Sequence, residues 1–309
     1  MSQTAFFTEP KGRTDKPSVL KALEVDYTPE GAAVLGVMGL GLEMPCHRPR
    51  RVLHPSLGSG VWARAIVACY PRDTLTIVGV EPRESERQNM VEACPDGVFV
   101  MDFEEFLGIK HEPFDFVIDN IPFTGFPRRD KKRRIDTWGW HIEMLRAGLL
   151  TDDAIVAFYG LTQMGQGEAA QASMREWSPT LALRYGGRNE HRGEGTERLA
   201  PIPKKYRVPG GPTHEMRENG GDSREYTLWV WSVADRNYRG CRRREVDGFK
   251  PGSRNDPLRY RVRSPRWETV QLPVLPKHLR CWSPDAVPGT RPIPQETVDT
   301  VAALLRGGL

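Results

Sequence analysis

The chain has 309 residues, 39% of them hydrophobic and 27% charged, and its net charge is +4. This length suffices for one large or two ordinary domains with a buried core. No apolar run reaches the ~18 residues that a membrane-spanning helix needs. The N-terminal residues also lack the basic and then apolar pattern of a secretory signal. We therefore expect a cytoplasmic protein without a membrane segment.

The five cysteines lie far apart, form no Cys-x-x-Cys pair and are odd in number. Closely spaced or paired cysteines are typical of zinc sites and of disulfide frameworks. We expect free thiols, a reducing compartment and no bound metal.

Short apolar runs alternate with helix-like segments along the first half of the chain. Such alternation, at intervals of ~20–35 residues, is typical of a doubly wound parallel sheet. The predicted fold class is therefore α/β and Rossmann-like, with a mostly parallel sheet. Its first helix is expected to have Thr28 as N-cap and Pro29 in the first turn. The other expected elements are strands at 51–53, 76–80, 98–101, 114–119 and 154–158, and helices at 61–70, 84–94 and 139–150.

The pattern becomes irregular beyond residue 180, until a β-prone run at 226–232 that is expected to add a strand. We expect an N-terminal arm at 1–25 and one domain at 26–235. Residues 236–309 form a basic appendage that is rich in Arg and Pro. Within this appendage only 296–305 has a helical pattern.

Two glycines, Gly58 and Gly60, lie in the turn between the first strand and the next helix. Glycines there let backbone N–H groups approach a ligand closely. Glu81 ends the following strand, where a carboxylate can accept hydrogen bonds from both hydroxyls of a ribose. This pattern indicates an adenosine-containing cofactor; the alternative is a tight turn with a solvated Glu81. The earlier Gly39 and Gly41 end a helix and are not part of this pattern.

Asp102 follows the expected strand at 98–101. It could accept a hydrogen bond from the amino group of the cofactor adenine, with Phe103 packed beside the ring. Alternatively Asp102 is the N-cap of the next helix, and both roles can hold at once.

The segment FDFVIDNIPFTGF ends a strand at Asp119, at the carboxyl edge of the sheet, where ligands bind in such folds. Pro122 fixes its own φ and supplies no N–H, so the carbonyl before it can point into a pocket. Phe123 can stack on a flat substrate. Acceptors from Asp119 and a backbone carbonyl would pull an exocyclic amine toward sp³ geometry for methyl transfer. The alternative is an ordinary turn after a buried strand.

Residues 119–123 resemble the signature of S-adenosylmethionine-dependent amino methyltransferases, in particular the DNA adenine-N6 methyltransferases of bacteria and phages. That signature is Asp, Asn or Ser, then Pro-Pro and an aromatic residue. Two alignments are possible, and the natural one is Asn120-Ile121-Pro122-Phe123. The resemblance then implies Asn120 as acceptor for the amino group, with Asp119 just upstream. Ile121 also occurs at this place in the ribosomal-RNA adenine dimethylases, so RNA stays an alternative substrate.

Other segments extend the resemblance over about 26–232. Asp26-Tyr27-Thr28-Pro29 is similar to a segment that touches the cofactor in this family, and LHPSLGSG, with Pro55, is similar to its Gly-rich turn. His54 replaces the usual acid there. LTQMGQ at 161–166 and GDSREY at 221–226 are similar to later motifs. The resemblance implies a class I methyltransferase fold, the cofactor S-adenosylmethionine, and Tyr27, Thr28 and Pro29 beside it.

Basic residues are clustered, which suggests contacts with phosphates; the alternative is solvated loops. An insert at 186–224 is the candidate for target recognition. An adenine within a duplex must be flipped out before its amino group is reached. Alternatives to DNA adenine are RNA adenine, another amino group, or a non-catalytic nucleic-acid-binding protein on a decayed fold. The expected nucleic-acid-binding residues are Arg128, Arg129, Lys131, Lys132, Lys204, Lys205, Arg207, Arg242 and Arg243.

Overall fold

The fold is that of a computed structural model of the chain. It describes residues 26–58, 60–84, 87–94, 96–120, 139–162, 173–174, 176–186, 189–193, 197–201, 214–218, 222–235, 267–280 and 292–307.

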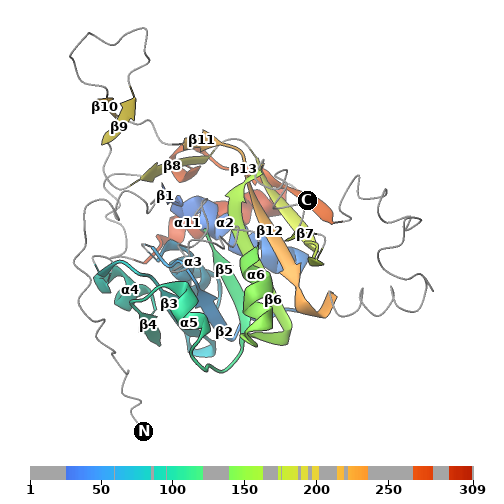
Figure 1. Cartoon of the computed structure of the whole chain (residues 1–309). Coiled ribbons are helices and arrows are strands. Elements are labelled where there is room, and N and C mark those ends of the chain that lie inside the picture. Colours follow the sequence, from blue (N-terminus) through green and yellow to red (C-terminus); the bar gives the residue numbers. More distant parts are fainter. Residues whose placement is uncertain are drawn as a thin grey trace, which may run out of the picture.

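A single eight-stranded sheet organises the molecule (Figure 1). Its strands are β2 (Arg51–His54), β3 (Thr76–Val80), β4 (Gly97–Phe99), β5 (Phe114–Asp119), β6 (Leu150–Leu161), β7 (Leu181–Gly186), β12 (Tyr226–Ser232) and β13 (Glu268–Val274). The spatial order is β13-β7-β12-β6-β5-β2-β3-β4. Strand β12 runs antiparallel to both of its neighbours, and the other pairs are parallel. The predicted mostly parallel, doubly wound sheet is confirmed.

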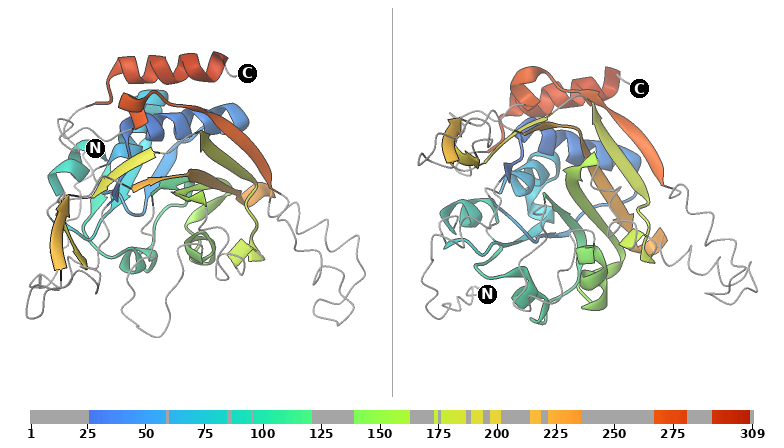
Figure 2. Two further views of the ribbon diagram at one scale, coloured as in Figure 1. Left: turned by 90° about the horizontal axis from the view of Figure 1, so that it is seen from above. Right: turned by 45° about the horizontal axis from the view of Figure 1, so that its top comes forward.

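Helices cover both faces of this sheet, as the view along the sheet in Figure 2 shows. One face carries α2 (Glu30–Glu43), α3 (Val61–Cys69), α4 (Arg87–Ala93) and α11 (Gln295–Gly307), and the opposite face carries α5 (Phe103–Leu107) and α6 (Trp140–Arg146). Two further short helices are η1 (Arg72–Thr74) and α10 (Lys277–Arg280). Alternate residues of the central strands therefore enter one of two cores, which is the period-2 pattern of a buried strand.

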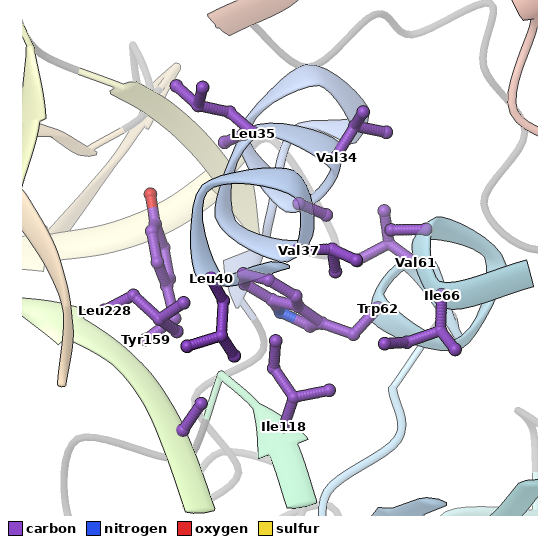
Figure 3. Close-up of a cluster of buried hydrophobic side chains, with 14 of the residues drawn as sticks. Val34, Leu35, Val37, Leu40, Val61, Trp62, Ile66, Ile118, Tyr159 and Leu228 are labelled. Atoms are coloured by element: carbon purple, nitrogen blue, oxygen red, sulfur yellow. The ribbon is translucent and has the colours of Figure 1, made fainter. Parts of the chain in front are cut away.

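The larger core lies between the sheet and the helices α2, α3 and α11. The rings of Trp62 and Tyr159 lie 5.4 Å apart at its centre. Burying each such large apolar side chain contributes about 1.5–3 kcal/mol, so this contact helps to fix α3 over β6. Figure 3 shows the side chains that meet there: Val34, Leu35, Val37, Leu40, Val61, Trp62, Ile66, Ile118, Tyr159 and Leu228.

Several helix bounds differ from expectation: α3 ends at Cys69 instead of residue 70, and α4 spans Arg87–Ala93 instead of 84–94. Pro29, and not Thr28, is the N-cap of α2, which begins at Glu30. The helix expected at 139–150 ends at Arg146, because Gly148 adopts a positive φ of 68° and turns the chain into β6. Only glycine adopts that conformation without strain.

Part of the expected appendage belongs to the domain. Strand β13 pairs in parallel with β7 and extends the sheet, and Leu272 is 3% exposed. Helix α11 packs on α2 through Val298, Val301 and Leu305. The sequence concealed β13 because only one of its seven residues is buried, which leaves no apolar run to detect.

The expected insert at 186–224 contains four short strands that the sequence did not predict. They are β8 (Asn189–Gly193), β9 (Glu197–Pro201), β10 (His214–Glu218) and β11 (Asp222–Arg224). Strands β9 and β10 form an antiparallel pair that projects from the body of the fold in Figure 1. Strand β8 pairs with β11 and also with β1 (Asp26–Tyr27), so the insert is anchored to the start of the described chain.

Candidate functional site

The candidate site lies where the order of the parallel strands reverses. Strand β2 lies between β3 and β5 in the sheet. After β2 the chain adds β3 and β4 on one side of β2, and it then crosses to the other side, where it forms β5 and β6. In open α/β sheets the crevice at this switch point, beyond the carboxyl ends of the strands, is the usual ligand site. The Gly-rich turn follows β2, and Asn120 follows β5.

Asp119 joins the two sides of this switch point. Its Oδ2 accepts a hydrogen bond from the backbone N–H of Ser56 at 2.6 Å, and its Oδ1 accepts from the N–H of Asn120 at 2.7 Å. The residue is 2% exposed. Burial raises the pKa of Asp119 well above its usual value, which the charge of Glu81 reinforces and the two N–H donors oppose. Both side-chain oxygens of Asp119 therefore bind backbone N–H groups. Asn120 lies nearer the surface than Asp119.

Asn120 makes a long-range side-chain contact at the site. Its Nδ2 donates a hydrogen bond to Oγ1 of Thr28 at 3.1 Å, and its backbone oxygen lies 3.5 Å from Oγ of Ser56. Thr28 is 4% exposed and lies between β1 and the first turn of α2. The segment at 26–29 and the end of β5 thus meet, as expected of two parts of one site.

Glu81 closes the Gly-rich turn from the end of β3. Its Oε2 accepts from the N–H of Gly58 at 2.9 Å, and its Oε1 accepts from the N–H of Arg83 at 3.2 Å and from Nε of Arg83 at 2.7 Å. The side chains of Arg83 and Glu81 are 7% and 6% exposed. Gly58 and Gly60 have φ angles of 54° and 75°, in the left-handed region that favours glycine. Gly39 and Gly41 lie within α2, away from any strand–helix turn.

His54 ends β2 directly before this turn and is fully buried. Its Nδ1 lies 2.7 Å from the backbone oxygen of Ile118, which can only accept, so Nδ1 carries the proton and Nε2 is an acceptor. Burial lowers the pKa of His54 to about 4, although the bond to Ile118 acts in the opposite direction. Within the described part of the chain, Nε2 has no hydrogen-bond partner.

These groups fit the adenosine part of a cofactor. A carboxylate has about four acceptor positions, and Gly58 and Arg83 use three of those of Glu81. Glu81 can therefore accept one ribose hydroxyl directly and a second when Arg83 releases one bond. The turn between β2 and α3 also brings main-chain groups to the position that an adenosine cofactor needs.

The structure gives other predicted site residues further roles. Asp102 is the N-cap residue of α5, and its backbone oxygen accepts from Glu105 and Phe106. Phe103 is 1% exposed and packs in the core against Phe106 and Trp140. Contacts of Asp102 and Phe103 with adenine stay predictions. Pro55 is buried in the turn after β2, and Pro29 is buried at the start of α2.

Several predicted residues lie outside the described part of the chain. Of Tyr27 only the backbone, in β1, is described. The remaining residues outside the description are Ile121, Pro122, Phe123, Arg128, Arg129, Lys131, Lys132, Lys204, Lys205, Arg207, Arg242 and Arg243.

Sequence reasoning missed two participants, Arg83 and the backbone N–H of Ser56. The signal for Arg83 was available, because the segment VEPRE places a cation two residues after the strand-end Glu81. Ser56 contributes a main-chain group, which carries no side-chain signature.

Among the described residues, no group of three or more His, Cys, Asp or Glu side chains is placed to hold a metal ion. In the same residues no helix has both the length and the apolar character to cross a bilayer.

No family model matches the chain, and no curated protein matches it. Among similar solved structures is a protein from Listeria monocytogenes, described as a class I S-adenosylmethionine-dependent methyltransferase. It is 11% identical, with a TM-score of 0.47, over 79% of this chain and 65% of that one. Another is the methyltransferase subunit of a type I restriction-modification system from Streptococcus thermophilus, 13% identical, with a TM-score of 0.43, over 67% of this chain and 44% of that one.

A third is an S-adenosylmethionine-dependent O-methyltransferase from Thermotoga maritima, 12% identical, with a TM-score of 0.38, over 63% of this chain and 64% of that one. The chain thus spans less than two thirds of the length of each of these proteins. The sheet itself, with its reversal at β2 and β5 and its antiparallel β12, confirms the predicted fold class, a Rossmann-like class I methyltransferase fold.

Proposed function

We propose that the chain is an S-adenosylmethionine-dependent methyltransferase that methylates the 6-amino group of a flipped-out adenine in DNA. The observation that carries the proposal is the position of Asn120, directly after β5 and in contact with Thr28 across the switch point. An amide at this edge can accept a hydrogen bond from an exocyclic amine beside a cofactor held by the Gly-rich turn.

The cofactor is proposed to lie across the turn after β2. Glu81 would accept hydrogen bonds from its ribose, Asp102 would accept from its adenine amino group, and Phe103 would border the ring. Around its remaining part lie Tyr27, Thr28, Pro29, Pro55, Gly58 and Gly60.

When bound, S-adenosylmethionine would supply a methyl group activated by its sulfonium sulfur, and the bond from this sulfur to the methyl carbon would break to leave S-adenosylhomocysteine. The lone pair of an adenine 6-amino group is delocalised into the ring, so the amine is a poor nucleophile. The Asn120 oxygen and the backbone carbonyl before Pro122 would accept its two N–H bonds. As the new N–C bond forms, positive charge develops on the amine, so these acceptors stabilise the transition state more than the ground state. The amine then loses one proton to solvent, and no strong base is required.

The nucleic-acid partner is proposed from charge. The phosphates of the nucleic acid would be contacted by basic residues in the run at 128–134 and in the tract from residue 242 onward. Lys204, Lys205 and Arg207 in the insert would contact phosphates as well. Phe123 would stack on the flipped base, whose extrusion costs a few kcal/mol. One alternative substrate is RNA adenine, because Ile also occurs at the position of Ile121 in the ribosomal-RNA adenine dimethylases. Another alternative is a different amino group.

The test is transfer of labelled methyl from S-adenosylmethionine to unmethylated DNA, with RNA in parallel and digestion to nucleosides. We expect label in 6-methyladenine from DNA. Asn120→Ala and Phe123→Ala should abolish transfer while the affinity for the cofactor stays within several-fold. Label from RNA alone would support the alternative substrate. Cofactor binding without label in any nucleoside contradicts a nucleic-acid substrate, and no cofactor binding supports a decayed fold.

A further inference from the structure

The short helix α10, which follows β13, consists mainly of basic residues. Its sequence is KHLR, in which Leu279 is the one apolar residue. The side chains of Lys277 and His278 are exposed, and that of Arg280 is partly exposed. In the part of the chain that the structure describes, none of these three basic side chains forms an ion pair. The charges of Lys277 and Arg280 are therefore available to a partner.

The topology of the sheet brings α10 to the edge at which the candidate site lies. Strand β13 runs parallel to β7, and β12 is antiparallel to both β7 and β6, so β13 has the same direction as β6 and β5. Its carboxyl end therefore lies at the same edge of the sheet as the end of β5, where Asp119 and Asn120 lie. Only Leu275 and Pro276 separate the end of β13 from α10.

Helix α10 is fixed against the first turn of α2. Its Leu279 packs against the larger core, and a Cβ at Gly31 would overlap the backbone oxygen of Leu279. Glycine at position 31 thus permits α10 to lie directly on α2. Gly31 follows closely after Thr28, whose hydroxyl accepts from the side chain of Asn120. The basic residues of α10 are thereby held beside the candidate site.

The surroundings of α10 favour a phosphate-bearing partner. The acid in the first turn of α2, Glu30, is already paired with Arg64 of α3 at 3.6 Å. Exposed ammonium and guanidinium groups without acidic partners attract phosphates. A helix that binds a lipid surface also presents a broad apolar face, whereas Leu279 packs against the core. A nucleic acid, which presents a row of phosphates, therefore fits this cluster better than a lipid surface does.

We propose that α10 binds the phosphate backbone of a nucleic acid through Lys277, His278 and Arg280, beside the base that enters the candidate site. The inference rests on the nucleic-acid partner of the proposed function. It assigns a contact to residues that were not among the nucleic-acid-binding residues expected from the sequence. Because phosphate contacts carry no base information, α10 contributes affinity and orientation and leaves the choice of sequence to other residues.

The experiment measures the affinity of the full chain for a fluorescein-labelled, unmethylated DNA duplex by anisotropy, over a range of salt concentrations, with RNA in parallel. Lys277→Gln/Arg280→Gln removes two charges and keeps the length of both side chains. Each lost phosphate contact should reduce the steepness of the salt dependence by about 0.9 in the logarithmic slope, so the total reduction should be about 2. At about 0.1 M salt the affinity should be about 10–100-fold lower, and the curves should converge toward about 1 M.

Arg50→Gln/Lys110→Gln is the matched control. It removes two exposed charges at the opposite edge of the sheet, where Arg50 directly precedes β2 and Lys110 precedes β5. The control should keep the wild-type salt dependence, and Lys277→Arg/Arg280→Lys, which retains both charges, should keep most of the affinity. Urea unfolding should distinguish none of these variants from the wild type, since the altered side chains lie at the surface.

Two results for these variants would overturn the proposal. One is an unchanged salt dependence in Lys277→Gln/Arg280→Gln. The other is an equal loss of affinity in this variant and in the control, which would show an effect of net charge alone. Vesicles of phosphatidylserine test the other source of phosphate. A wild type that binds these vesicles, or nothing, in place of DNA and RNA would also contradict the inference.

Binding and methyl transfer separate this inference from the proposed function. If the wild type binds DNA through α10 and transfers no methyl group, the proposed reaction fails and the inference stands. If the wild type methylates DNA and Lys277→Gln/Arg280→Gln binds it normally, the inference is wrong and the proposed function stands. The same dependence on α10 with RNA alone supports the inference together with the alternative substrate.

Discussion

The carboxylate of Asp119 and the backbone N–H of Ser56 meet at 2.6 Å across the switch point of the sheet. This hydrogen bond ties the end of β5 to the Gly-rich turn after β2, so the segment that would bind the cofactor and the segment that would bind the target amine share one support. Asp119 thereby supports both segments of the proposed site, in which Asn120 is proposed to face the substrate.

We predict that Asp119→Ala lowers the free energy of unfolding by about 2–4 kcal/mol, because it leaves two backbone N–H groups without their acceptor. It should also lower methyl transfer at least tenfold by separating the two segments. Urea unfolding and initial rates measure the two effects. Asp115→Ala is the control: Asp115 accepts from the N–H groups of Arg50 and Arg51 at the other end of β5. Equal loss of activity in both variants would contradict the role given to Asp119.

His54 predicts a pH dependence of stability. Its pKa is about 4 in the folded chain and 6.5 as the ordinary value, so the unfolded chain binds more protons between these values. The free energy of unfolding should therefore fall as the pH falls from 6.5 to 4. His54→Asn keeps a donor for the oxygen of Ile118 and removes this titration. Between pH 7 and 5 the wild type should lose about 2 kcal/mol more than the variant. Parallel curves for the two proteins would contradict the prediction.

The buried pair of Glu81 and Arg83 predicts a coupled loss of stability and affinity. Glu81→Ala leaves Arg83 buried without this carboxylate, which costs about 3–5 kcal/mol. The loss of the ribose acceptor should weaken the affinity for S-adenosylmethionine at least tenfold. Urea unfolding and calorimetry measure these effects. Glu84→Ala breaks an exposed pair with Arg87 and should change either quantity little. A Glu81→Ala protein that binds the cofactor normally would exclude Glu81 from the ribose site.

The edge strand β13 predicts that residues beyond 236 contribute to stability. Leu272 is 3% exposed and packs in the larger core, whereas Val274 in the same strand is 57% exposed. Leu272→Ala should lower the free energy of unfolding by about 2–5 kcal/mol, because it empties buried volume. Val274→Ala should change it by less than about 0.5 kcal/mol. A small effect of Leu272→Ala would show that β13 is not integral to the fold.

The parts of the fold that the sequence predicted are those with local signals. Strand β3 (TIVGV) is mostly apolar and ends directly before Glu81, and strand β5 (FDFVID) is mostly apolar and ends at Asp119, so their bounds were predicted correctly. Strand β8 has the polar sequence NEHRG, and its pairing with β1 depends on residues more than 160 positions away. Propensity and periodicity contain no information about such pairing.

The candidate site shows the same division. The strand-end position of Glu81 and the positive φ angles of Gly58 and Gly60 follow from a local pattern. The tie between Asp119 and Ser56 involves a main-chain donor, and the contact between Thr28 and Asn120 crosses 92 residues. Neither could be predicted from residue types alone, because each depends on where the sheet brings two distant turns together.

The packing of α11 on α2 has a consequence for the synthesis of the chain. Val298, Val301 and Leu305 complete a core that begins with the apolar residues of α2. Helix α11 is made about 250 residues after α2, which at the usual 5–20 residues per second is a delay of roughly 10–50 s. During that time the side of α2 that packs against α11 has no cover. A ribosome-bound or prematurely terminated chain therefore exposes apolar surface that chaperones can bind and through which nascent chains can aggregate.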